Sequence, residues 1–148
     1  MKIRLLSIAL LLAIPAAATP ADLRSVAGMQ FHNRVLLVFA PSLRDPRLAI
    51  QRQTMAKAVL EASARDLILV QVAGDAVIGA HDKADRLRRH FQIAPNLYRT
   101  LLIGKDGNVA RTTAGPIEAA ALMHVIDAMP MRQEEVRRAR AGLPGADL

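Results

Sequence analysis

Two predominantly apolar runs stand out along the chain, at residues 34–40 and 66–73. Each is rich in Val, Leu and Ile, which is typical of a strand that is buried on both faces. Between them, residues 46–62 repeat apolar positions at helical spacing, after an Asp45-Pro46 pair typical of a helix start. Strand, helix and strand joined by short links predict a right-handed crossover unit with parallel pairing.

The second half of the chain predicts a short helix and then a hairpin. Asp82, with Asp85 three residues later, resembles a capping box that opens the helix. Residues 98–104 and 109–113 have strand-like composition, and the Lys-Asp-Gly-Asn turn at 105–108 joins them. Because Asp-Gly between two strand-like runs is a strong hairpin signal, we expect these two strands to be antiparallel.

The C-terminal part predicts two more helices. Gly115-Pro116 opens the first of them, and Pro130 stops it. The second spans 132–141, with Glu134 placed to pair with Arg138. This order of elements predicts an α/β, thioredoxin-like fold. Its central mixed sheet combines a parallel βαβ unit with a C-terminal β-hairpin, and helices flank it.

The N-terminus has the pattern of a secretory signal peptide. A positive start is followed by an apolar run at 5–14, and three alanines precede an expected cleavage before Thr19. The alternative is an uncleaved anchor, for which the apolar run is short. We therefore expect an exported protein, periplasmic or secreted. The predicted divisions are a signal peptide (1–18), a lead-in segment of low order (19–33), a thioredoxin-like domain (34–130), and a short C-terminal helix with a tail (131–148).

Composition narrows the chemistry. The chain has 148 residues, a formal net charge of +7 and no cysteine. Without cysteine it has no disulfide framework, zinc-thiolate site, thiol nucleophile or dithiol redox centre. With no Trp, one Tyr and three Phe, it also lacks the stacking platform that single-stranded nucleic acid favours.

Two stretches resemble known families. The segment from 91 to 109 resembles the second half of thioredoxin and peroxiredoxin domains. Residues 102–107 together with 126–133 resemble an uncharacterised exported family of bacterial single-domain proteins, related to a domain of vertebrate extracellular sushi-repeat proteins. This resemblance implies a thioredoxin-like fold but supplies no catalytic residue or cofactor. Its signature residues, which we interpret as structural, are Gly104, Lys105, Asp106, Gly107, Met129, Pro130, Met131 and Arg132. A Met-rich corner that receives a partner's side chain is the alternative interpretation.

The resemblance also indicates where a redox centre would lie. In redox-active thioredoxins the strand that matches 35–40 leads into a Cys-x-x-Cys pair, and here 41–45 (Pro-Ser-Leu-Arg-Asp) occupies that place. Arg99 stands where those proteins carry a cis-proline. Disulfide exchange and thiol peroxidase activity are therefore excluded.

The same loop is the candidate ligand or partner face, comprising Ser42, Arg44, Asp45, Arg47 and Arg99. A helix N-terminus with arginines nearby favours a carboxylate or phosphate. The alternative is that Asp45 only caps the helix and the arginines are solvated. No cofactor is implied.

The remaining polar residues suggest no enzyme class. The four histidines, at 32, 81, 90 and 124, lack metal-ligand spacing, and no nucleophile elbow surrounds Ser42. Two basic runs, 86–90 and 137–140, are typical of solvated helix faces; the alternative is weak association with an anionic membrane surface. Nucleic acid is not an expected partner of an exported chain.

We therefore predict a redox-inactive binding or interaction module of the cell envelope. Its partner is an unknown protein or a small anionic ligand. Two alternatives stay open: an enzyme with thiol-independent chemistry at the same loop, and a basic protein associated with anionic envelope surfaces.

Overall fold

The computed structural model describes residues 24–144. In chain order the elements are η1 (Ala27–Met29), β1 (Arg34–Ala40), α1 (Pro46–Lys57), α2 (Val59–Ser63), β2 (Leu67–Ala73), β3 (Ala76–Ile78), α3 (Ala84–Phe91), β4 (Arg99–Ile103), β5 (Val109–Thr113), α4 (Ala119–Asp127) and α5 (Pro130–Arg140). The predicted signal peptide and cleavage site lie outside the described residues. Within them, no helix is long and apolar enough to cross a membrane.

The strands form one five-stranded sheet in the order β3-β2-β1-β4-β5. β1 pairs with β2 in parallel over its whole length, and the other neighbours are antiparallel. β1 lies in the middle, and every one of its residues is buried. This arrangement confirms the predicted mixed sheet, with its parallel βαβ unit and its hairpin of β4 and β5.

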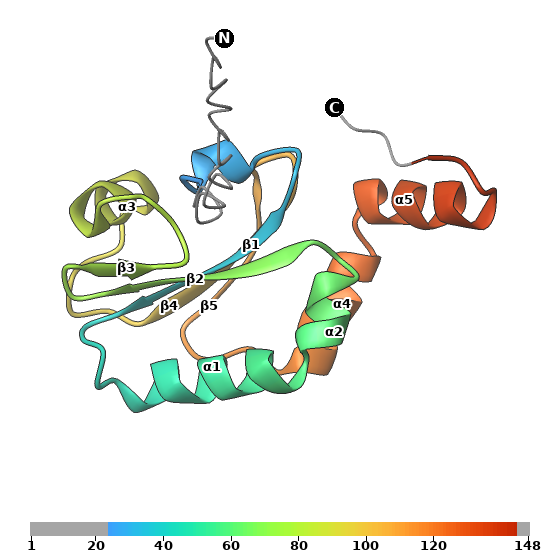
Figure 1. Ribbon diagram of the computed structural model, residues 1–148. Coiled ribbons are helices and arrows are strands. Elements are labelled where there is room, and N and C mark those ends of the chain that lie inside the picture. Colours follow the sequence, from blue (N-terminus) through green and yellow to red (C-terminus); the bar gives the residue numbers. More distant parts are fainter. Residues whose placement is uncertain (1–23, 145–148) are drawn as a thin grey trace, which may run out of the picture.

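Helices cover both faces of the sheet (Figure 1). One face packs against α1, α2 and α4, and the other packs against α3 and η1. Alternate residues of β1 serve the two sides, because successive side chains of a strand point to opposite faces. Val38 therefore lies in the core under α1 and α4, whereas Phe39 lies in the core under α3.

The helix after β1 starts as predicted but is not continuous. Asp45 is its N-cap, with its carboxylate accepting a hydrogen bond from the N–H of Arg47, and Pro46 is the first helical residue. The predicted helix over 46–62 is interrupted at Ala58, which has φ −106° and ψ 28°, and so it forms the separate helices α1 and α2.

Two predictions around the short helix were wrong or incomplete. Asp82 does not form a capping box: Lys83 is the N-cap of α3 without a side-chain bond, and the Asp82 carboxylate accepts the N–H of Val26 (2.7 Å). Asp85 pairs instead with Arg89 at 2.8 Å. The short strand β3 was not predicted at all, because only three residues pair with β2.

The C-terminal helices are shifted from their predicted bounds. Gly115-Pro116 does not open α4, which begins at Ala119 after the N-cap Glu118. Pro130 does not stop that helix, which ends at Asp127; it is the first residue of α5. Proline is tolerated at a first helical position because the N–H it lacks would have no helical partner. Figure 1 shows that α5 projects from the side of the molecule.

Candidate functional site

The loop at residues 42–45 follows the C-terminal end of β1. Its backbone forms a turn in which the N–H of Asp45 donates to the carbonyl of Ser42 (3.2 Å). The Ser42 hydroxyl accepts the N–H of Arg44 (3.3 Å). Ser42, Leu43 and Arg44 are exposed, and the side chain of Asp45 is buried. The loop thus presents three side chains to solvent from an ordered turn.

The first turn of α1 already has an internal anion. The Asp45 carboxylate accepts hydrogen bonds from Nε (3.0 Å) and Nη2 (2.7 Å) of Arg47, and these bonds lower the pKa of Asp45. The Arg47 guanidinium also lies 4.6 Å from the ring centroid of Tyr98, whose hydroxyl donates to the Arg47 carbonyl (3.3 Å). Burial raises the pKa of Tyr98, so this hydroxyl stays protonated. Asp45 and Arg47 therefore stabilise the loop and the helix start.

Arg99 lies on the other side of the sheet from Arg47. Tyr98 and Thr100 face α1, so Arg99 between them faces α3, where it is opposite Phe39 in register. Its Nη1 donates to the carbonyl of Tyr98 (3.1 Å). The predicted face is therefore split, with Arg44 and Arg47 after β1 and Arg99 at the neighbouring strand end.

Sequence reasoning missed Arg88, which it assigned to a solvated basic run. The side chain is only 7% exposed and donates to the carbonyls of Ala40 (2.8 Å) and Ala94 (3.3 Å). Its guanidinium carbon lies 5.5 Å from the centroid of Phe39. Burial lowers the pKa of Arg88, against the charge of Asp75. Within residues 24–144, Arg88 forms no ion pair, so a desolvated positive charge lies beside the end of β1.

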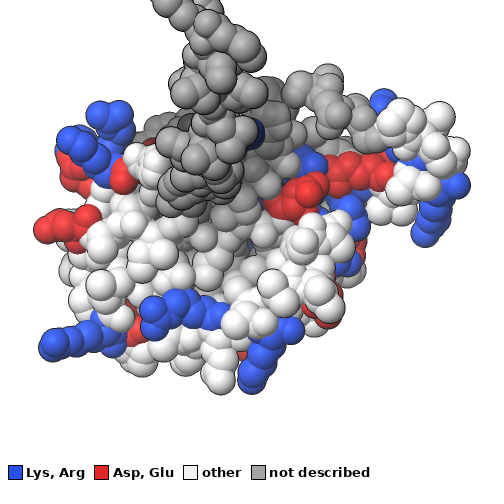
Figure 2. All heavy atoms as spheres, viewed as in Figure 1, with Lys and Arg blue, Asp and Glu red and all other residues white. Residues whose placement is uncertain are grey.

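The other basic residues of the two runs have mixed surroundings. Figure 2 shows basic side chains over α3, beside α1 and on α5. Arg89 pairs with Asp85, whereas Arg137 and Arg138 both pair with Glu134. The run on α5 is therefore partly neutralised by one carboxylate.

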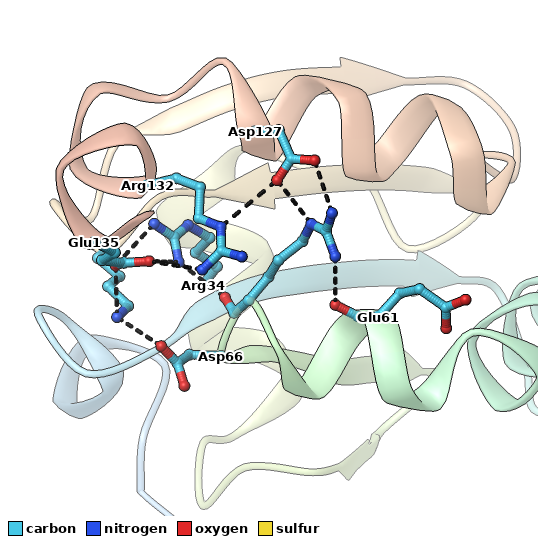
Figure 3. Close-up of polar contacts among 8 residues, drawn as sticks. Arg34, Glu61, Asp66, Asp127, Arg132 and Glu135 are labelled. Atoms are coloured by element: carbon cyan, nitrogen blue, oxygen red, sulfur yellow. Dashed lines mark hydrogen bonds and ion pairs between the residues drawn. The ribbon is translucent and has the colours of Figure 1, made fainter. Parts of the chain in front are cut away.

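The opposite end of the sheet carries a connected ion-pair network (Figure 3). The fully buried guanidinium of Arg34 donates to both carboxylate oxygens of Glu135 on α5, at 3.0 and 3.3 Å. Lys105 contacts Glu135 (2.8 Å), and Arg132 also contacts it (3.3 Å). Asp66, Asp127 and Arg65 extend the network, through Lys105–Asp66 and Arg65–Asp127 pairs of 2.8 and 2.7 Å.

Glu135 is the common anion of three cations. Its burial alone would raise its pKa, but hydrogen bonds from Lys105 and Arg34, together with their charges, outweigh burial and lower it. The hydrogen bond from Arg65 likewise lowers the pKa of Asp127. Every basic side chain of this network therefore has a carboxylate partner, in contrast to Arg88 and Arg99 at the other end of the sheet.

A family of domains of unknown function, DUF4174, matches residues 25–135. The chain belongs to this family. Over 51 residues it is also 39% identical to coiled-coil domain-containing protein 80 of the zebrafish Danio rerio, and the match covers 34% of this chain and 6% of that protein. The chain thus spans a small fraction of this relative's length. The matched vertebrate protein is named for a coiled coil, so the expected link to sushi-repeat proteins stays a prediction.

Solved structures similar to this DUF4174 domain have the thioredoxin fold. A reduced 2-Cys peroxiredoxin of Plasmodium vivax aligns with a TM-score of 0.59 at 13% identity, covering 73% of this chain and 83% of that chain. Plasmodium yoelii Prx1a aligns with a TM-score of 0.54 at 17% identity, covering 83% and 85%. The thioredoxin-like fold is therefore shared, while this sequence contains no cysteine of the kind that the 2-Cys peroxiredoxin is named for.

Two of the residues that carry the family resemblance, Lys105 and Arg132, lie in the ion-pair network. Lys105 and Arg132 both contact Glu135, which brings the two separate signatures together. Gly107 has φ +82°, a conformation that glycine adopts without strain. Met129 packs against the core under α4. The structural interpretation of the signature residues stays a prediction.

The described residues show no arrangement typical of a metal centre. Among them, no group of three or more His, Asp or Glu side chains is placed to hold a metal ion. The two ends of the sheet differ in charge pairing. At the network every cation has a carboxylate partner, whereas at the end of β1 Arg47 pairs with Asp45, and Arg44, Arg88 and Arg99 pair with no carboxylate among the described residues.

Proposed function

We propose that this DUF4174 domain is a redox-inactive binding module of the cell envelope. Its binding surface, which we call the anion edge, comprises Ser42, Arg44, Arg88 and Arg99 at the end of β1. One observation carries the proposal: within the described residues none of these three arginines has a carboxylate partner. An unpaired, partly desolvated cation is attractive to an anion.

The position of the anion edge supports this assignment. Ligands of open α/β sheets bind outside the carboxyl ends of the strands, and the loop at 42–45 follows such an end of β1. The internal Asp45–Arg47 pair holds the turn, so the exposed Arg44 needs little reordering to meet a ligand. Arg88 on α3 adds a positive charge whose position is fixed, because its guanidinium donates to two backbone carbonyls.

The expected ligand group is a carboxylate or a phosphate, since arginine binds both in a bidentate manner. It belongs either to a partner protein or to a small envelope anion. Thiol chemistry has no part in this function, because the chain contains no cysteine. Export rests on the pattern of residues 1–18 and is part of the proposal.

Titration with inorganic phosphate and with acetate, observed through the backbone amides of residues 42–45, tests the anion edge. We expect saturable shifts, which Arg44→Ala and Arg99→Ala each weaken several-fold. Arg111→Ala is the matched control. Arg111 is an exposed residue of β5, so this substitution removes the same charge away from the anion edge. Shifts that are absent, or that the control weakens equally, would refute the anion edge.

A further inference from the structure

An open groove of about 540 Å³ lies between α1, α2 and the first half of β2. Met55, Val59 and Ala62 line it from the helices, and Leu67 and Leu69 line it from the strand. Because β1 and β2 are parallel, the start of β2 lies at the opposite end of the sheet from the loop that follows β1. The groove is therefore separate from the anion edge.

The strand that borders the groove has an open backbone edge. β3 pairs only with the last three residues of β2. The Asp66 carbonyl accepts the N–H of Arg34 (2.9 Å), so it faces β1. Because the backbone groups of successive strand residues point to opposite sides, the N–H and C=O groups of Leu67 and Leu69 point away from β1. The backbone of Gly79 packs closely against the Leu69 carbonyl, because a Cβ atom added to Gly79 would lie only 2.5 Å from the carbonyl oxygen. Within the described part of the chain, the outward N–H and C=O of Leu67 have no strand partner.

The side chains beside this edge form an apolar receptor. Met55 and Leu67 are each 7% exposed and form the floor, whereas Val59 on the rim is 59% exposed. An added strand presents every second side chain to one face. Its backbone would bond to Leu67, and its apolar side chains would cover Val59 and Met55, as in recognition by β-strand addition.

The charges around the groove favour an acidic occupant. Arg52 lines the groove and forms no ion pair with any described residue. Asp66, the acidic residue of the lining, is engaged by Lys105 at 2.8 Å. A second copy of this chain would bring its own formal charge of +7 and is disfavoured on that ground.

We propose that this groove binds an extended acidic segment of a partner protein, which adds as a strand to the open edge of β2. Backbone hydrogen bonds to Leu67 fix its register. Apolar side chains enter between Met55 and Val59, and a carboxylate of the segment pairs with Arg52. This docking surface is independent of the anion edge, so either proposal stands if the other fails.

The probe is a short acetylated peptide that carries two valines and one glutamate on the same face of an extended strand, at every second position with serine between them. The corresponding peptide with lysine in place of the glutamate is its control. We expect the valine–glutamate peptide to bind saturably, to shift the amide resonance of Leu67, and to bind more tightly than the lysine peptide. Arg52→Glu should weaken binding roughly tenfold, because an attraction becomes a repulsion. Val59→Asp should abolish it.

Two neighbouring substitutions are matched controls. Lys57→Glu reverses an exposed charge of α1 outside the groove, and Leu60→Asp changes a residue that is 79% exposed on α2 and does not line the groove. Both should bind like the wild type. No saturable binding, equal binding of the two peptides, or equal loss in the controls would overturn the proposal. So would a concentration-dependent dimer that Val59→Asp abolishes, because a second copy would then fill the groove.

Discussion

Glu135 and its neighbour Glu134 allow a matched test of the ion-pair network. Replacing Glu135 by Ala leaves the fully buried Arg34 with only the carbonyl of Arg65 (2.8 Å) as its partner. It also removes an anion from Lys105. Breaking a buried ion pair by removing one partner costs about 3–5 kcal/mol. Because the Glu135 side chain is 27% exposed and water can replace part of its charge, we expect about 3 kcal/mol, the lower end.

Glu134→Ala makes the same substitution one residue earlier on α5. Glu134 is 46% exposed and pairs with Arg137 and Arg138 at the surface, so its loss should cost only about 0.5 kcal/mol. Helix propensity changes equally in both variants and cancels in the comparison. Urea unfolding followed by far-UV circular dichroism gives both free energies of unfolding, with an unchanged m-value as the check on two-state behaviour. Variants within about 0.5 kcal/mol of each other would refute the reasoning.

Three further predictions concern stability. Folding lowers the pKa values of Asp127 and Glu135, so these two carboxylates stabilise the folded state fully at pH values above the pKa of an unfolded carboxyl. This stabilisation is lost as the pH falls through their lower folded pKa values. The free energy of unfolding in urea should therefore fall between about pH 5 and pH 2, and it should depend less on pH in Glu135→Gln. Gly107→Ala should cost about 1 kcal/mol or more in thermal unfolding, because its φ is +82°, whereas Gly115→Ala, with open space around it, should cost nothing; equal effects would contradict this. Gln51→Met should lower the free energy of unfolding in urea by about 2–4 kcal/mol, because the buried backbone N–H and C=O of Ile117, before α4, lose their side-chain partner. A loss below about 1 kcal/mol would refute this prediction.

Local signals predicted most of the sheet. The apolar runs at 34–40 and 66–73 favour buried strands, and both strands are observed: β1 is fully buried, and β2 is buried except at the half-buried Ile68 and Leu69. The cap formed by Asp45 and Pro46 was predicted because its signal lies within three residues of the helix start. Pro130 was misjudged because proline both ends one helix and begins another, and the choice depends on how α5 packs.

The ion-pair network and the buried arginine could not be predicted in the same way. Arg34 and Glu135 are 101 positions apart, so no local pattern connects them. Arg88 lies in a basic run that resembles a solvated helix face, and only the packing of α3 on β1 shows that it is buried. Lys105 and Arg132 come from two separate stretches of the sequence that carry the family resemblance, and both contact Glu135.

Site-specific photo-crosslinking in cells tests the anion edge most directly. The probe replaces exposed Ser42, and a control probe replaces exposed Asn108 in the turn at the other end of β4. The proposal predicts a discrete adduct from Ser42 alone, which Arg44→Ala reduces. The intact mass of that adduct distinguishes a protein partner from a small anion. A folded variant that gives no adduct, or equal adducts from both positions, would contradict the proposed function.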